Sequence, residues 1–182
     1  MLNKKIEQTK ISYYDEKNIE EYLEKSSIKL QLPAELIKFS EEHNIDIHEI
    51  NYGVFPSSEW YFTFPKVIKG EFKVEYSTVL TISKLTTVYS LLNCFEVENQ
   101  DTEQMVPTLS GDSEEAYSKL QYDFLILASE IFQNLEYDRL SFEKGTEKIE
   151  GLKFSDDVVL FGPDVTVYDL LYRDVLDVTP DD

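Results

Sequence analysis

Apolar side chains change their spacing along this chain of 182 residues, and the change predicts a fold that combines an antiparallel sheet with helices. Between residues 49 and 83 apolar and polar side chains alternate, most clearly at Trp60, Phe62 and Phe64, as in strands with one buried and one solvated face. Between residues 117 and 135 the apolar positions lie three or four residues apart, which predicts one long amphipathic helix.

Shorter elements are predicted around this frame: helices at 15–25 and 33–44, a central strand at 86–97, a polar loop at 99–112, and short strands at 137–140 and 158–161. Pro33 suits the first turn of a helix, and Asn44 suits a left-handed C-terminal cap. Thr166 and Asp169 have the spacing of a capping box, which predicts a short last helix.

These elements predict an α+β fold: N-terminal helices, an antiparallel sheet of about five strands, and one long helix and a short C-terminal helix packed on the sheet. The length favours a single acidic domain, residues 1–182, that can build a core without disulfides or metal. Cys94 is the only cysteine, which excludes a disulfide within the chain. Its apolar neighbours predict a buried structural thiol rather than a nucleophile.

Acidic residues dominate the charge: there are 36 Asp and Glu against 17 Lys and Arg, a formal net charge of −19. The excess is uneven, because residues 1–91 carry 11 basic and 14 acidic side chains whereas residues 92–182 carry 6 and 22, a net charge of −16. Such a chain repels phosphate backbones and anionic membranes and attracts basic proteins. We therefore expect a basic protein partner and neither nucleic acid nor membrane; acidity that serves only solubility is the alternative.

The N-terminus and the short apolar runs predict a cytoplasmic protein. No apolar stretch follows the lysines of residues 1–18, so we expect no secretory signal. The longest apolar run, at 124–128, has five residues, far fewer than the roughly 20 that cross a bilayer. Abundant Lys, Ile and Glu, with only two Arg, indicate a bacterial source.

Motifs for catalysis, metals or cofactors do not stand out. His43 and His48 flank Asp46, but a spacing of five does not place two histidines on one helix face. The sequence contains no glycine-rich phosphate loop, glycine-flanked serine or alternating-Asp calcium loop. We expect no enzyme activity, no metal and no cofactor, and surface positions for both histidines at a junction between helix and strand.

Candidate partner-binding residues are aromatic or acidic: Trp60, Tyr61, Asp112, Glu114, Glu115, Asp156 and Asp157. Interface hot spots are rich in aromatic residues, so whichever of Trp60 and Tyr61 faces outward is a candidate anchor. We expect Glu114 and Glu115 in the first turn of the long helix, where the helix dipole favours negative charge. The other acids are expected in loops.

The segment 28–44 resembles the helix that opens proteins of the SUKH superfamily. The resemblance rests on Leu32-Pro33-Ala34-Glu35-Leu36-Ile37-Lys38-Phe39, followed by Glu42-His43-Asn44. Many members of that superfamily are immunity proteins that neutralise toxic nucleases. The resemblance implies a bacterial toxin-immunity protein that binds a basic toxin domain and blocks its active site or its substrate.

Three functions remain open at this point. The first is a cytoplasmic immunity or antitoxin-like inhibitor of a basic toxin or effector; the alternative is a phage-type anti-defence protein or DNA mimic; a small enzyme is less favoured. A regular row of acids would favour the mimic, and a compact acidic patch ringed by aromatic residues would favour the inhibitor. A deep pocket that contains a perturbed carboxylate or His43 would favour the enzyme.

Overall fold

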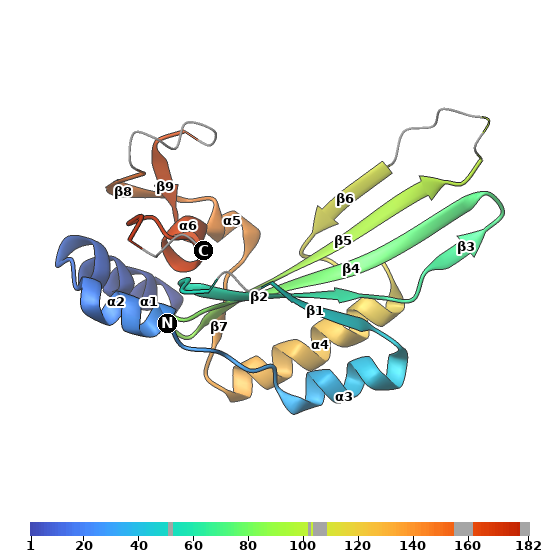
Figure 1. Cartoon of the computed structure of the whole chain (residues 1–182), viewed down its shortest axis with the longest axis horizontal. Helices are drawn as coiled ribbons and strands as arrows, with labels where there is room; N and C mark the ends of the chain where they lie inside the picture. Colours follow the sequence, from blue (N-terminus) through green and yellow to red (C-terminus); the bar gives the residue numbers. More distant parts are fainter. Residues whose placement is uncertain (51–52, 102, 104–108, 155–161, 179–182) are drawn as a thin grey trace.

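The computed structural model describes residues 1–50, 53–101, 103, 109–154 and 162–178, and these form the predicted α+β fold (Figure 1). The main sheet contains seven strands: β1 (Asp46–Ile50), β2 (Ser57–Thr63), β3 (Val67–Lys69), β4 (Phe72–Ser83), β5 (Val88–Asn99), β6 (Leu109–Ser113) and β7 (Asp138–Arg139). Five of them follow the order β1-β2-β4-β5-β6, β3 pairs with β4, and β7 pairs with β5. Only the β5–β7 pair of this sheet is parallel.

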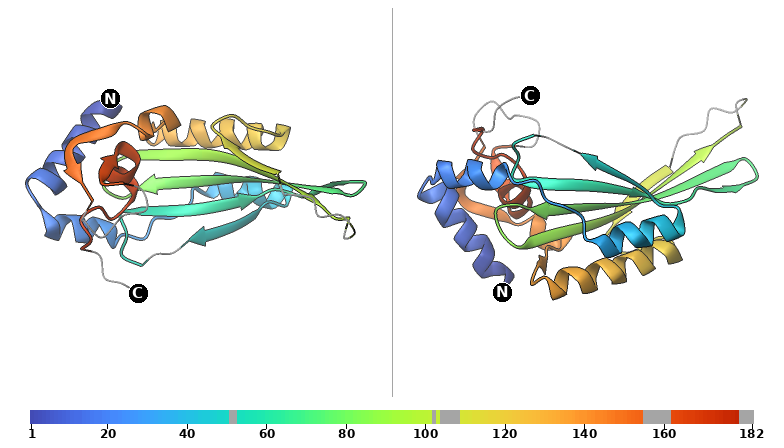
Figure 2. Two further views of the ribbon diagram at one scale, coloured as in Figure 1. Left: turned by 90° about the horizontal axis from the view of Figure 1, so that it is seen from above. Right: turned by 60° about the horizontal axis from the view of Figure 1, so that its bottom comes forward.

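The remaining elements are helices and one small sheet: α1 (Leu2–Thr9), the π-helical turn η1 (Lys10–Asp15), α2 (Ile19–Ser26), α3 (Ala34–His43), α4 (Lys119–Asn134), α5 (Phe142–Gly145), α6 (Val167–Tyr172), and the strand pair β8 (Lys148–Lys153) with β9 (Asp164–Thr166). Helices α3 and α4 lie side by side along one face of the main sheet (Figures 1 and 2). The other helices and the small sheet gather at one end of it.

The core between the main sheet and helices α3 and α4 follows from the alternation in β2. Trp60, Phe62 and Phe64 all point toward the helices and are buried, and the ring of Phe62 lies 4.5 Å from that of Phe124 in α4. Leu80 of β4 and Leu91 of β5, which are paired, continue this core across the sheet. The long β4–β5 hairpin therefore has one apolar face, covered by helices.

A second core lies at the end of the sheet, where α6 packs against α1, α2 and the turn of the β4–β5 hairpin. Three buried hydroxyl groups tie α6 to its neighbours. Tyr14 donates to the carbonyl of Leu170 (3.0 Å), Ser83 to that of Leu171 (2.8 Å), and Ser57 to that of Tyr172 (2.9 Å). They satisfy carbonyls in the last turn of a helix, which have no partner within the helix itself.

Helix α4 confirms the predicted long helix but begins later than expected. Ser118 is its N-cap and forms a capping box with Gln121, so Glu114 and Glu115 precede the helix and do not lie in its first turn. Gln121 is fully buried: its Oε1 accepts from the backbone N–H of Ser118 (3.1 Å), and its Nε2 donates to the carbonyl of Ser77 (2.9 Å). This polar residue fixes the start of the helix on the sheet.

Several predictions of detail are confirmed. Asn44 has a left-handed backbone (φ 53°) and ends α3. The hydroxyl of Thr166 accepts from the N–H of Asp169 (3.2 Å), whose carboxylate accepts from the N–H of Thr166 (2.9 Å), so the capping box is formed. The strand expected at 137–140 is present as β7. The strand expected at 158–161 lies outside the described residues.

Two predictions of detail are wrong. The expected loop at 99–112 contains β6, an edge strand in which Ser, Gly and Asp give no apolar alternation. The first expected helix, at 15–25, begins at Ile19 and is preceded by α1 and η1. Only two residues of helix α1, Ile6 and Thr9, are buried.

In the part of the chain that the structure describes, no helix has both the length and the apolar character that crossing a membrane would require.

Substitution of Gln121 tests how strongly its amide holds α4 on the sheet. We expect Gln121→Ala to lower the free energy of unfolding by about 2 kcal/mol, because it removes a capping box and a buried hydrogen-bonding group. Gln133→Ala, on the exposed side of the same helix, is the matched control and should change it by less than about 0.5 kcal/mol. Urea unfolding measures both, and equal effects would contradict this role.

Candidate functional site

The face of the main sheet opposite to α3 and α4, which we call the open face, carries mostly polar side chains. Residues directly opposite each other in antiparallel strands point to the same side, so the strand register defines its composition. Its successive rows are Ile50, Glu59, Thr81 and Ser90; His48, Tyr61, Val79 and Leu92; Asp46, Thr63, Ser77, Cys94 and Asp112; and Glu75, Glu96 and Ser110.

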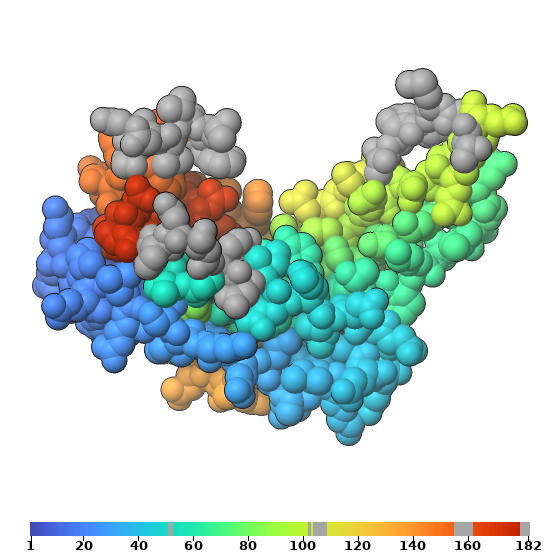
Figure 3. All heavy atoms as spheres, in the orientation of Figure 1, coloured from blue at the N-terminus to red at the C-terminus, as the bar shows by residue number. Residues whose placement is uncertain are grey.

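A pocket of about 420 Å³ lies where the open face meets α5, α6 and the small sheet. In the space-filling view the molecule is hollowed between its C-terminal elements and the outer half of the sheet (Figure 3). The paired residues Val79 and Leu92 line the sheet side of the pocket. Leu140 and Phe142 add apolar surface next to α5. The pocket is therefore largely apolar where it contacts the sheet.

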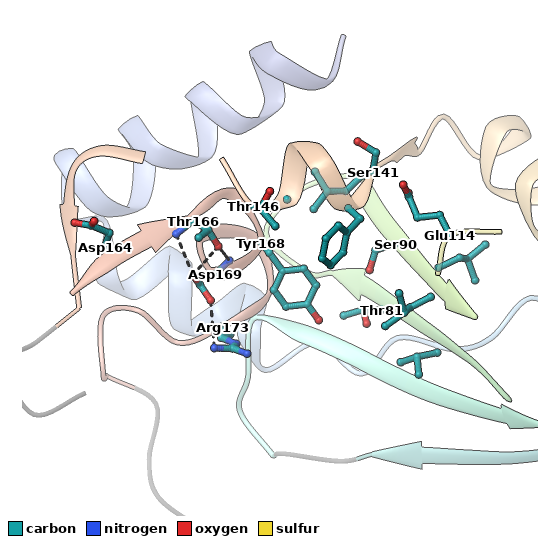
Figure 4. Close-up of a pocket in the computed structure, with 16 residues that line it drawn as sticks. Thr81, Ser90, Glu114, Ser141, Thr146, Asp164, Thr166, Tyr168, Asp169 and Arg173 are labelled. Atoms are coloured by element: carbon teal, nitrogen blue, oxygen red, sulfur yellow. Dashed lines mark hydrogen bonds and ion pairs between the residues drawn. The ribbon is translucent and has the colours of Figure 1, made fainter. Parts of the chain in front are cut away.

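Hydroxyl groups supply most of the polar lining. Thr81 and Ser90 lie opposite each other in β4 and β5, and the ring of Tyr168 extends from α6 toward them (Figure 4). Burial raises the pKa of the Tyr168 phenol, so this group is neutral at physiological pH. These hydroxyls can donate or accept hydrogen bonds without adding charge.

The charged side chains that line the pocket already have partners. Their ion pairs are Glu114 with Arg139 (3.9 Å), Asp164 with Lys148 (2.6 Å), and Asp169 with Arg173 (3.3 Å). Asp169 also accepts hydrogen bonds from the backbone and hydroxyl of Thr166, as the dashed lines in Figure 4 show. The pocket therefore presents little uncompensated charge.

Glu59 borders the pocket and is the acid on the open face whose pKa is clearly raised. Burial is the main cause; the hydroxyl of Thr81, which donates to its Oε2 (3.3 Å), and the charge of Arg173 act in the opposite direction. Burial thus makes the ionised form of Glu59 unfavourable, and no ion pair among the described residues stabilises that form.

Acidic charge on the open face is unevenly compensated. Toward the outer end of the β4–β5 hairpin, Lys66 pairs with Glu75 (3.0 Å) and Lys73 with Glu98 (2.9 Å). Glu96, in the same row as Glu75, and Glu59 and Asp112, which lie closer to the pocket, have no basic side chain at ion-pair distance within the described ranges. The open face therefore has a region of net negative charge next to an apolar pocket.

The structure places the predicted partner-binding residues on different surfaces. Tyr61 of β2 and Asp112 of β6 both lie on the open face, but β4 and β5 separate them. Glu114 directly follows β6 and lines the pocket. Trp60 is only 3% exposed and packs in the core under α3 and α4, so its candidacy as a surface anchor is wrong. The alternation in β2 sends Trp60 and Tyr61 to opposite faces, and the core takes the larger indole ring.

The other predicted binding residues, Glu115, Asp156 and Asp157, contribute no side chain to the pocket lining that the structure describes. Glu115 is exposed in the segment before α4, where its backbone N–H bonds to the hydroxyl of Ser113 (3.0 Å). Asp156 and Asp157 lie outside the described residues.

His43, His48 and Cys94 do not assemble into a reactive site. His43 ends α3, where its ring stacks on Phe39 at 4.2 Å and its Nδ1 lies 2.9 Å from the Phe39 carbonyl. His48 is exposed on the edge strand β1. Cys94 is half-buried on the open face rather than buried, and burial together with the charge of Asp112 raises the pKa of its thiol, which disfavours the nucleophilic thiolate. Among the described residues, no three His, Cys, Asp or Glu side chains gather in a way that could hold a metal ion.

Sequence reasoning missed the residues that α5 and α6 contribute to the pocket. Tyr168 and Arg173 reach the open face because α6 folds back on β4, far away in sequence. Phe142 reaches it from α5, which packs against α6. The capping box at Thr166 and Asp169 located α6 but carried no signal for what it packs against.

Comparisons with protein-family models, with curated protein sequences and with solved structures found no match to this chain.

Replacement of Glu59 tests the electrostatics of the open face. Because its folded-state pKa is raised above the ordinary value of 4.5, the folded protein binds this proton more tightly than the unfolded chain, and ionised Glu59 destabilises the fold at neutral pH. We expect Glu59→Gln to raise the melting temperature at pH 7, with the gain shrinking as the pH falls toward 4. Exposed Glu41→Gln on α3 is the control. If Glu59→Gln lowers the melting temperature at pH 7 and Glu41→Gln does not, the conclusion that burial raises the pKa of Glu59 is contradicted.

Proposed function

We propose that this protein is a cytoplasmic inhibitor of the immunity or antitoxin type, which binds a basic bacterial toxin or effector through its open face. The observation that carries the proposal is the uncovered sheet face on which Glu96 and Asp112 lie near an apolar pocket. Tyr61 and Tyr168 place aromatic rings on the same side. Interfaces commonly combine a desolvated apolar anchor site with surrounding polar groups.

The distribution of charge supports a basic partner. Residues 92–182 carry a net charge of −16, and three of their acids, Glu96, Asp112 and Glu114, lie on or beside the open face. Acids without ion-pair partners leave a negative potential that accelerates encounter with a positively charged surface. The resemblance of residues 28–44 to the SUKH superfamily agrees with an immunity role, since those residues include α3 and its cap.

Mimicry of DNA by the open face is less well supported. Glu59, Glu96 and Asp112 lie on three different strands and in three different rows, separated by Ser and Thr. The phosphates of a DNA strand follow one another at regular spacing. This irregular arrangement favours a protein inhibitor over a mimic of the double helix.

An enzymatic role has one observation in its favour, the raised pKa of Glu59 beside a pocket. The neighbours of Glu59 include Thr81, Tyr61 and Arg173, and His43 lies at the end of α3, which packs on the other face. A second acid or base beside Glu59 would be needed for general acid–base catalysis. Binding accounts for the pocket more simply.

A capture experiment with matched variants tests the proposal. The full chain, the double variant Glu96→Gln with Asp112→Asn, and the control Glu35→Gln with Glu41→Gln on α3 are each immobilised and exposed to an extract of the native host. Both double variants remove two negative charges. We expect the unaltered chain and the control to retain the same protein with an excess of Lys and Arg, and the open-face variant to retain much less of it.

Kinetics then separate an inhibitor from the alternatives. Steering by charge acts on association, so the open-face variant should bind the captured protein about tenfold more slowly at low salt and nearly normally at about 0.5 M salt. Retention of identical proteins by all three chains would contradict the proposal. Release of the captured protein by duplex DNA would favour the mimic instead.

A further inference from the structure

The pocket between the open face and helices α5 and α6 has properties of its own that the acidic surface does not explain. We propose that it binds an uncharged aromatic side chain, Trp or Tyr, supplied by the basic protein partner. The chemistry of the ligand is argued from the pocket alone. Only the source of the aromatic side chain rests on the proposed inhibitor function.

The apolar lining is the first reason. Val79 and Leu92 are only partly covered although both are apolar and central in the sheet. Phe142 lines the same pocket and is 63% exposed. Exposed apolar surface concentrated in a concave site marks a place where another apolar group binds. An aromatic ring on the ligand can pack edge-to-face or offset against the rings of Phe142 and Tyr168.

The state of the charges is the second reason. Glu114, Asp164 and Asp169, the acids that line the pocket, all have basic partners, so a cationic side chain there would have to compete with an existing ion pair. Glu59 lies outside the lining, and burial disfavours its ionised form. An anionic side chain would have to compete with Asp169 for Arg173. Transfer of a charged group into a largely apolar site without a new partner is unfavourable. The pocket therefore selects a neutral group, whereas the acidic surface outside it attracts positive charge.

Hydrogen-bonding groups are the third reason, because they distinguish Trp and Tyr from purely apolar side chains. Thr81, Ser90 and Tyr168 present hydroxyls around the pocket (Figure 4). An indole N–H or a phenol O–H has one apolar body and one polar atom, which matches this lining.

The pocket is large enough to hold one aromatic side chain. Its volume of about 420 Å³ lies near the lower end of the 300–1,000 Å³ that is usual for ligand pockets. Aromatic anchors in such pockets, surrounded by polar contacts that exclude water, supply most of the affinity in many interfaces. The two parts of the site then have separate roles: the acidic surface affects association, and the pocket affects dissociation.

Small neutral and charged probes test the chemistry of the pocket. N-acetyl-tryptophanamide, N-acetyl-lysinamide and N-acetyl-aspartate are titrated separately into the isotope-labelled full chain and followed by amide NMR. We expect saturable shifts of the Gly145 and Tyr168 amides with the tryptophan probe, and at least tenfold weaker binding of the two charged probes. Equal binding of the lysine probe, or no saturable shift at these amides, would overturn the proposal.

Matched variants locate the binding. Phe142→Ala removes an exposed ring from the pocket, and Phe72→Ala removes a comparably exposed ring (48%) from the outer end of β4. We expect the first to weaken binding of the tryptophan probe about tenfold or more and the second to leave it unchanged, as a local contact requires. Val79→Phe fills the pocket from the sheet side and should abolish binding of the tryptophan probe. Binding that survives both pocket variants would overturn the assignment.

The source of the aromatic side chain is tested on the captured partner. If it comes from the partner, Phe142→Ala should speed dissociation about tenfold while association stays nearly constant, and Phe72→Ala should do neither. Unchanged dissociation of the partner, together with lost binding of the probe, would overturn the partner as the source and assign the pocket to a free aromatic molecule. If no basic partner is captured at all, the probe experiment still decides the chemistry of the pocket.

Discussion

Helices α3 and α4 cover one face of the β4–β5 hairpin along its length, whereas α5 and α6 meet the opposite face at one end only. This unequal coverage determines the remaining surface of the molecule. Apolar residues at every second position of β2 and β4 meet α3 and α4, so the intervening residues must face away from the helices. Gln121 reinforces the arrangement, because its amide joins the start of α4 to a carbonyl of β4. The open face and its polar character follow from the same alternation that builds the core.

The pocket depends on the second core rather than on the first. Hydroxyls of Tyr14, Ser57 and Ser83 hold the last turn of α6 against the N-terminal helices and the sheet. That contact brings Tyr168 over the open face and places Arg173 close enough to Glu59 to affect its pKa. A binding pocket thus arises where two separately packed cores meet, and α6 is the element on which its shape depends.

Local patterns in the sequence were enough to predict the elements but not the site. Alternation showed that Trp60 and Tyr61 lie on opposite faces, yet only the structure shows that Trp60 is the buried one. The caps at Asn44 and Thr166 were predictable because their partners lie within four residues. The pocket was not, since Val79, Phe142 and Tyr168 meet through contacts between distant segments, which a local pattern does not encode.

Carboxyl footprinting of the complex with the captured partner tests the central claim most directly, because the claim concerns which acids a partner covers. Free and bound protein are labelled with a carbodiimide and glycine ethyl ester, and each modified Asp and Glu is measured by mass spectrometry. The account predicts that Glu96 and Asp112 become protected while Glu35 and Glu41 of α3 remain fully reactive. Protection on α3 with no change at Glu96 and Asp112 would contradict it.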